Sequence, residues 1–213
     1  MSEIEKNLLD SSFKYYPPLF YHNALSLRCG LSLGSMRSAL KRAREIFGIL
    51  FEDGPDAVVF NYAITDYSES GGAGETAPAS GPSLRYETHK LRFLLSFQDE
   101  YRHEAIRDVA CALSAEDGLV RNNRMICYSD GRGFDNEKLI RQCAEDRFNP
   151  DLGFVSFKNE CVMCIYDDRG CDVVFADAGK FLAFYPKLEP YLLDYDRALM
   201  EERKKQAESM IMA

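Results

Sequence analysis

The sequence predicts an α+β fold with a ferredoxin-like βαββαβ core, an appended antiparallel β-meander and C-terminal helices. Segments with period-two hydrophobicity alternate with segments of helical spacing, in the order strand, helix, strand, strand, helix, strand. The last third of the chain then holds three short apolar segments separated by turn residues. With 213 residues, the chain is long enough to bury a core without the support of disulfides.

The first half of the predicted core consists of two strands joined by a helix. Apolar and polar residues alternate over residues 25–31, which is typical of a strand with one buried face. Apolar residues then recur at helical spacing over residues 36–51, and Ser35 is placed to cap that helix. Gly54 and Pro55 stop the helix, and the β-branched and aromatic residues 57–65 predict the second strand.

A segment rich in Gly, Ser, Ala and Pro separates the two halves of this core. Residues 67–83 contain almost no side chains that could be buried, which indicates a flexible surface loop. Beyond it, the patterns predict a strand over residues 91–97, a helix over 101–113, a strand over 125–128 and a helix from Asp135 to about Arg147.

The last third predicts three strands, over residues 154–157, 161–166 and 171–175. A helix follows from its cap at Asp177 to about Tyr185, where Pro186 breaks it. Pro190 suits the first turn of a final helix that runs toward residue 208.

The chain is interpreted as one α+β domain over residues 1–213. An alternative division places the βαββαβ core in residues 20–148 and the meander with the C-terminal helices in residues 150–213. The sequence alone leaves open whether the meander joins the first sheet, and it does not indicate an oligomeric state.

Composition and charge narrow the class of function. The net charge of -8 argues against binding to nucleic acids or to anionic membranes, because phosphate groups would be repelled. The N-terminal residues lack the pattern of a signal peptide, and no apolar segment is long enough to span a membrane. Seven cysteines, an odd number, lie among apolar neighbours, which is typical of reduced thiols in a cytoplasmic protein.

The turn at residues 167–170 is the strongest candidate site. One interpretation is a tight hairpin in which Gly170 adopts a positive φ and Asp168 accepts hydrogen bonds from nearby amides. Another is a cation site in which Asp167, Asp168 and Asp172 converge and Arg169 holds an anion. A third is a rigid loop of mixed charge that contacts a partner. The hairpin is the favoured interpretation, because two adjacent residues of a hairpin point apart.

Two further patterns have simpler interpretations. Cys161 and Cys164 match a C-x-x-C pattern, but in the middle of a strand their thiols face opposite sides of the sheet and cannot share a metal ion. Arg37, Lys41 and Arg44 form a basic stripe at helical spacing, which is either a docking surface for an acidic partner or the solvated face of an amphipathic helix. The sequence predicts no cofactor and no bound metal.

The stretch from Ile165 to Val173, with its Tyr-Asp-Asp-Arg-Gly run, resembles the bacterial family catalogued as domain of unknown function 3885. Further similar segments are residues 18–21, the strand that carries Arg28, the Arg42-Ala43 pair and residues 193–196. The resemblance implies a bacterial cytoplasmic protein without an assigned activity, and it supplies no catalytic residues.

Two hypotheses of function follow. The favoured one is a non-catalytic protein-interaction module, of the toxin-neutralising or immunity type, whose acidic charge complements a partner with a basic surface. The alternative is a metal-assisted hydrolase centred on the turn from Asp167 to Gly170, with Asp172 as a further ligand.

Overall fold

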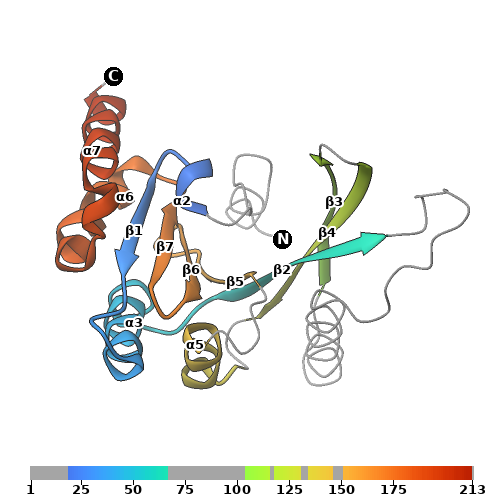
Figure 1. The fold of residues 1–213 in the computed structure, drawn as a ribbon. Helices are drawn as coiled ribbons and strands as arrows, with labels where there is room; N and C mark the ends of the chain where they lie inside the picture. Colours follow the sequence, from blue (N-terminus) through green and yellow to red (C-terminus); the bar gives the residue numbers. More distant parts are fainter. Residues whose placement is uncertain (1–18, 67–103, 116–117, 131–133, 146–150, 213) are drawn as a thin grey trace, which may run out of the picture.

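The computed structural model describes residues 19–66, 104–115, 118–130, 134–145 and 151–212, and it confirms the α+β class. In this part of the chain, seven strands form one sheet in the order β1-β7-β6-β5-β2-β4-β3 (Figure 1). The strands are β1 (Ser26–Gly30), β2 (Ala57–Asp66), β3 (Glu104–Ala115), β4 (Gly118–Asp130), β5 (Asp151–Ser156), β6 (Cys161–Asp167) and β7 (Gly170–Phe175).

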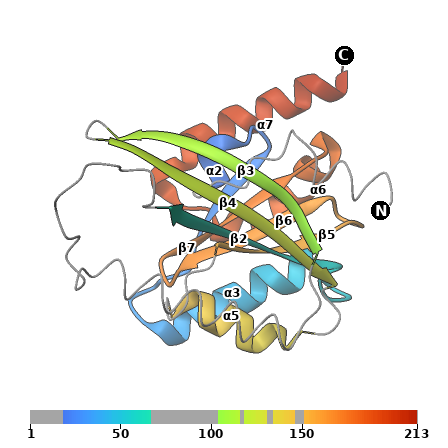
Figure 2. The ribbon, with the colours of Figure 1, turned by 90° about the vertical axis from the view of Figure 1, so that its right-hand side faces the viewer.

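Helices cover both sides of this sheet. They are α2 (Leu19–His22), α3 (Met36–Leu50), α5 (Asn136–Ala144), α6 (Ala178–Leu188) and α7 (Arg197–Met212), with 3₁₀ turns η2 (Glu189–Tyr191) and η3 (Asp194–Asp196). Figure 2 shows α3 and α5 side by side on one side of the sheet and α2 and α7 on the other. Helices α6 and α7 lie at the β1 end (Figure 1). None of the described helices is both long and apolar enough to cross a bilayer.

The N-caps expected at Ser35, Asp135 and Asp177 are confirmed, whereas Asp99, a fourth expected cap, lies outside the described residues. The Ser35 hydroxyl accepts a hydrogen bond from the Ser38 amide at 3.2 Å, which satisfies a free N–H at the start of α3. The Asp135 carboxylate does the same at the start of α5, at 3.0 Å, and the Asp177 carboxylate at the start of α6, at 2.8 Å. Short-range side-chain chemistry therefore defines where these helices begin.

The main core lies between the sheet and helices α3, α5 and α6. Phe154 of β5 packs edge-on against Phe47 of α3, with 5.1 Å between ring centroids. Phe175 of β7 stacks on Phe184 of α6 at 5.6 Å. The other core positions alternate along the strands and recur at helical spacing along the helices, as in Leu27, Cys29, Met163, Val173, Ala43, Ile46, Leu139 and Ile140.

The helix predicted over residues 101–113 is wrong, because residues 104–115 form strand β3. This strand pairs with β4 along almost its whole length, and the register shifts only between Ala105 and Arg107. The apolar residues of β3 do fit helical spacing, but pairing with a long neighbour overrides that local pattern. The Asp117-Gly118 dipeptide, which is typical of a hairpin, was the signal for the correct structure.

The ferredoxin-like order is not confirmed. That order needs a parallel strand pair, whereas every pair in the described sheet is antiparallel. The predicted meander is confirmed as β5, β6 and β7, and it lies in the middle of the sheet, because β5 pairs with β2 and β7 pairs with β1. The predicted loop 67–83 and the predicted strand 91–97 lie outside the described residues.

The ends of the chain also differ from the predictions. Helix α6 continues past Pro186 to Leu188, and Pro190 lies in η2 rather than in the final helix, which begins at Arg197. The amide of Leu192 donates to the Glu189 carbonyl at 3.2 Å, which closes a short turn instead of starting a helix. Before β1, the described residues Leu19–His22 form the helical turn α2.

Candidate functional site

Strand β1 is buried on both faces, whereas its alternation predicted one exposed face. Ser26 is completely buried and Arg28 is only 9% exposed, although both point away from the main core. Helix α2 contacts β1 and β7, and α7 contacts β1, so these helices cover the second face. A charged side chain in such a position needs partners, because an unpaired buried charge is strongly destabilising.

The main partner of Arg28 is Asp172 of β7. The register pairs these two residues across the sheet, so their side chains lie on the same face. The Arg28 Nε–H donates to Asp172 Oδ1 at 2.9 Å, and Nη2 donates to Oδ2 at 3.3 Å. Arg28 Nη1 also lies 3.5 Å from Oδ2 of Asp196, in η3. One guanidinium therefore joins two carboxylates that are far apart from it in sequence.

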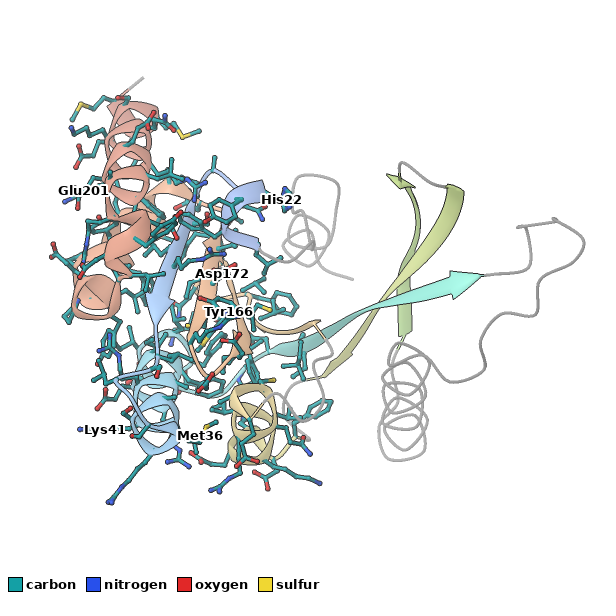
Figure 3. The ribbon with its side chains drawn as sticks, viewed as in Figure 1. His22, Met36, Lys41, Tyr166, Asp172 and Glu201 are labelled. Carbon is teal, nitrogen blue, oxygen red and sulfur yellow. The ribbon has the colours of Figure 1, made fainter. Side chains whose placement is uncertain are left out.

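Aromatic rings enclose the same guanidinium. Its central carbon lies 5.0 Å from the Phe20 ring centroid, 4.6 Å from that of Tyr21 and 5.5 Å from that of Tyr166. Such contacts favour a cation, most strongly where water is excluded. Figure 3 shows Tyr166 and Asp172 on neighbouring strands near the centre of the molecule. Arg28, Asp172, Asp196, Tyr21 and Tyr166 are called the Arg28 cluster below.

Burial and charge set the protonation of this cluster. Burial opposes the charge of Arg28, but its hydrogen bonds with Asp172 and the carboxylate charge keep its pKa above the usual value. Burial raises the pKa of the Asp172 carboxyl, and the guanidinium of Arg28 works against that rise. Burial also raises the pKa of the Tyr166 phenol, with a further contribution from the charge of Asp172. Tyr166 therefore stays neutral at physiological pH.

The N-terminal turn α2 is attached to the cluster by two hydrogen bonds. The Phe20 amide donates to Asp172 Oδ2 at 3.0 Å, and the Tyr21 hydroxyl donates to Asp196 Oδ1 at 3.2 Å. The other oxygen of Asp196, Oδ2, is buried, and no hydrogen-bond donor reaches it among the described residues. This Oδ2 atom interacts with Arg28 through charge alone, at 3.5 Å from Nη1.

A second arginine attaches helix α7 to the same region. Arg203 Nη1 donates to the Ser26 hydroxyl at 2.6 Å, and its guanidinium lies 4.1 Å from the Phe20 ring centroid. Burial lowers the pKa of Arg203, while the charges of Asp196 and Asp172 oppose that effect. The region as a whole thus contains two guanidinium groups and two carboxylates, which balance each other.

The acidic residues of the predicted turn site lie in two different environments. Asp167 accepts from the Arg169 amide and from Arg169 Nε, both at 2.7 Å, so its carboxylate is held within the hairpin. Asp172 instead points into the buried Arg28 cluster. Asp168 is half-buried and Arg169 is exposed. The carboxylates of Asp167 and Asp172 therefore bind different arginines and do not converge on one point.

Two details of the hairpin prediction need correction. The residue that accepts the turn's backbone hydrogen bond is Asp167, not Asp168. Gly170 is required by space rather than by a positive φ, which among the described glycines occurs at Gly34 and Gly54. A Cβ atom at position 170 would lie 2.6 Å from Tyr166 Cζ and 2.7 Å from the Cys29 carbonyl oxygen.

The basic stripe on α3 lies in solvent and is partly paired. Lys41 lies 3.7 Å from Glu45 one turn later, and Arg44 donates to Glu137 of α5 at 2.7 Å. Arg37 is exposed. Among the described residues, the structure therefore joins Arg44 to the neighbouring helix and shows no convergence of the stripe with the Arg28 cluster. Cys161 and Cys164 are both buried in β6.

An exposed patch lies over the Arg28 cluster, and the sequence did not identify it. Tyr195 is 87% exposed and Tyr21 is 47% exposed. The Asp194 side chain is 98% exposed. The Tyr21 hydroxyl binds Asp196, the residue after Tyr195, so Tyr21 borders the turn that carries Asp194 and Tyr195. Tyr21, Asp194 and Tyr195 are called the tyrosine surface below.

The Arg28 cluster itself could have been suspected from the sequence. Ser26 and Arg28 stand on one face of an apolar strand, and Asp172 stands in an equally apolar strand, which is a signal for charges paired across a sheet. The sequence could not show that these two strands are neighbours, since Arg28 and Asp172 are 144 positions apart.

Comparison with known proteins connects these segments to one family. A family model described as "Domain of unknown function (DUF3885)" matches residues 5–196, which is most of the chain and includes every member of the Arg28 cluster. No curated protein and no solved structure matches the chain. Of the segments that carried the resemblance, residues 18–21, Arg28, residues 165–173 and residues 193–196 contribute the whole Arg28 cluster, whereas the Arg42-Ala43 pair lies outside it. The chain belongs to the DUF3885 family.

Proposed function

We propose that this protein is a non-catalytic protein-interaction module of the bacterial cytoplasm, of the toxin-neutralising or immunity type, and that it binds a partner with a basic surface. The observation that carries the proposal is the tyrosine surface, where two exposed phenols and an exposed carboxylate are held on a fixed support. Exposed tyrosines that are already ordered are favourable contact residues, because binding costs them little conformational entropy.

The side chain of Tyr21 and the backbone that carries Tyr195 are both held in place. The hydroxyl of Tyr21 is bound to Asp196, and its ring packs edge-on against Phe20 with 5.1 Å between centroids. Tyr195 lies in η3, and the amide of Leu193, which precedes that turn, donates to the Arg28 carbonyl at 2.9 Å. On the other side of the turn, Arg197 donates to the Leu192 carbonyl at 3.2 Å. The Arg28 cluster thus acts as the foundation of the tyrosine surface.

Charge supports a basic partner. The net charge of -8 attracts a basic protein over distances of about 10 Å at moderate salt, and it speeds the first encounter. Location in the cytoplasm agrees with the burial of Cys29, Cys143, Cys161 and Cys171 as free thiols.

The geometry gives less support to the alternative, a metal-assisted hydrolase. A cation at the turn would have to displace Arg169 from Asp167, and a cation at Asp172 would have to displace Arg28 from a buried, two-point contact. The alternative remains a prediction. Its test is thermal unfolding with Mg²⁺, Mn²⁺ or Ca²⁺, which would have to raise the melting temperature of the wild type and not that of Asp168→Asn.

The proposed function is tested with the immobilised full-length chain and two variants. Tyr195→Ala removes the most exposed phenol of the tyrosine surface, and Leu33→Ala removes an apolar side chain of 69% exposure from the loop before α3. Proteins retained from native bacterial extract are identified by mass, and the main one is purified for a direct affinity measurement.

We expect one basic protein in near-equal amount, bound about tenfold or more weakly by Tyr195→Ala and equally well by Leu33→Ala. Binding should also weaken as salt rises. The proposal is overturned if no partner is retained, or if the purified partner binds Tyr195→Ala as tightly as the wild type.

A further inference from the structure

We infer that the partner is anchored by an arginine side chain, which stacks on the outer face of Tyr21 and binds the exposed carboxylate of Asp194, beside the buried charge of Asp196. This inference rests on the proposed function and specifies the chemistry at the tyrosine surface.

The first observation is that Tyr21 already binds a guanidinium on its inner side. Arg28 lies 4.6 Å from the ring centroid, on the side that faces the sheet. The ring is nevertheless 47% exposed, so a large part of it meets solvent. An aromatic ring attracts cations on both of its faces. The outer face of Tyr21 therefore offers a second guanidinium the same kind of contact.

The second observation is an acceptor oxygen that the chain leaves without a donor. Asp196 is 6% exposed, and its Oδ2 atom accepts no hydrogen bond from the described residues. A buried carboxylate oxygen gains considerably from a charged donor. The Tyr21 hydroxyl binds the other oxygen at 3.2 Å, so the negative charge of Asp196 lies beside the half-exposed ring and favours a cation there.

The third observation concerns the outermost carboxylate. Asp194 is almost fully exposed, and its ion pair with Arg197 spans 3.4 Å between two residues of the same turn. Exposed pairs of this kind contribute little, so an incoming cation can compete for the carboxylate. An arginine suits the arrangement better than a lysine, because its planar group stacks on a ring while its five N–H donors reach carboxylates at the edge.

The charges around this surface permit an added cation. Arg28 and Arg203 are buried near this surface and Arg197 pairs with Asp194, and the carboxylates of Asp172, Asp194 and Asp196 balance these three guanidinium groups. The net charge of -8 on the whole chain then favours an approaching cation.

The experiment uses the full-length protein and three synthetic peptides, acetyl-Gly-Gly-Xaa-Gly-Gly-amide, with arginine, citrulline or lysine in the middle. Citrulline has nearly the shape of arginine and no charge, so it is the matched control. Binding is followed by NMR with tyrosine-labelled protein, and the Tyr195 signal is assigned from its absence in Tyr195→Phe. Asp194→Asn and Leu33→Ala serve as site and control variants, since both replaced side chains are exposed.

We expect the arginine peptide to bind about tenfold more tightly than the citrulline peptide, with lysine between them, and to shift the Tyr195 signal. Asp194→Asn should weaken arginine binding severalfold, and Leu33→Ala should leave it unchanged. Equal binding of the arginine and citrulline peptides, or no binding at millimolar concentration, would overturn the arginine anchor. These outcomes are separate from the partner's response to Tyr195→Ala, which decides the proposed function alone.

Discussion

Replacing Asp172 by Asn tests whether the Arg28 cluster is a strongly coupled, buried ion pair. Asp172 is 1% exposed and accepts from Arg28 twice and from the Phe20 amide once. Removing one partner of such a pair costs about 3–5 kcal/mol, because the other charge stays buried without compensation. We expect a cost near the lower limit of this range, because Arg28 still has Asp196 at 3.5 Å and the Asn side chain still offers one acceptor oxygen. We therefore expect a loss of about 3 kcal/mol in the free energy of unfolding.

The assay is urea unfolding followed by circular dichroism, with the melting temperature as a second measure. For a chain of this length, about 3 kcal/mol corresponds to a decrease of about 6–12 °C. Asp167→Asn is the matched control, because that carboxylate also binds an arginine, but Arg169 is 78% exposed in its side chain. Its cost should be about 1 kcal/mol or less. If the two variants lose equal stability, the buried pair does not have the importance that the geometry assigns to it.

Three further predictions follow from individual side chains. Gly170→Ala should lower the free energy of unfolding by about 1–3 kcal/mol, because a Cβ atom has no room beside the Cys29 carbonyl. In the same urea assay, Gly48→Ala should raise the free energy of unfolding, because position 48 of α3 has space for a Cβ atom and alanine favours a helix more than glycine does. Burial and the hydrogen bond to Glu201 raise the pKa of Tyr185 above 10.0, so the unfolded state loses this proton first and the free energy of unfolding must fall as pH rises past 10.0. Tyr185→Phe should make that fall less steep by up to about 1.4 kcal/mol per pH unit. An unchanged slope would contradict the assignment. Burial raises the pKa of the Cys143 and Cys161 thiols to about 12, so both thiols should resist iodoacetamide in the native protein at pH 8. Both should react once urea unfolds the protein, and peptide mass mapping measures the difference.

The parts of the fold that local chemistry determines could be predicted from the sequence. The caps at Ser35, Asp135 and Asp177 depend on contacts three residues away, and their helices begin where the side chains indicate. The meander was equally accessible, because its strands are consecutive and short turns join them. In both cases the interacting groups are neighbours in sequence, so a single pattern contains the whole signal.

The parts that depend on distant pairing could not be predicted in the same way. The side chains of residues 104–115 fit a helix, and only the presence of β4 alongside makes them a strand. Arg28 and Asp196 were noticed as parts of family-like segments, but nothing local shows that their side chains meet. The sequence identified the candidate turn. It did not show that Asp172 points away from that turn and toward Arg28, because the partner of Asp172 depends on which strand lies beside β7.

The position of the meander has a consequence for how the chain folds during synthesis. Strand β1 is synthesised long before β7, which is its only partner in the described sheet and whose Asp172 follows Arg28 by 144 residues. Until β7 is made, Arg28 has no carboxylate from that strand, and the edge of β1 stays unpaired. Sheets that close over such distances form slowly and expose unpaired strands meanwhile. Completion of this sheet is therefore a late event, and a chain that stops before β7 is expected to require protection from aggregation.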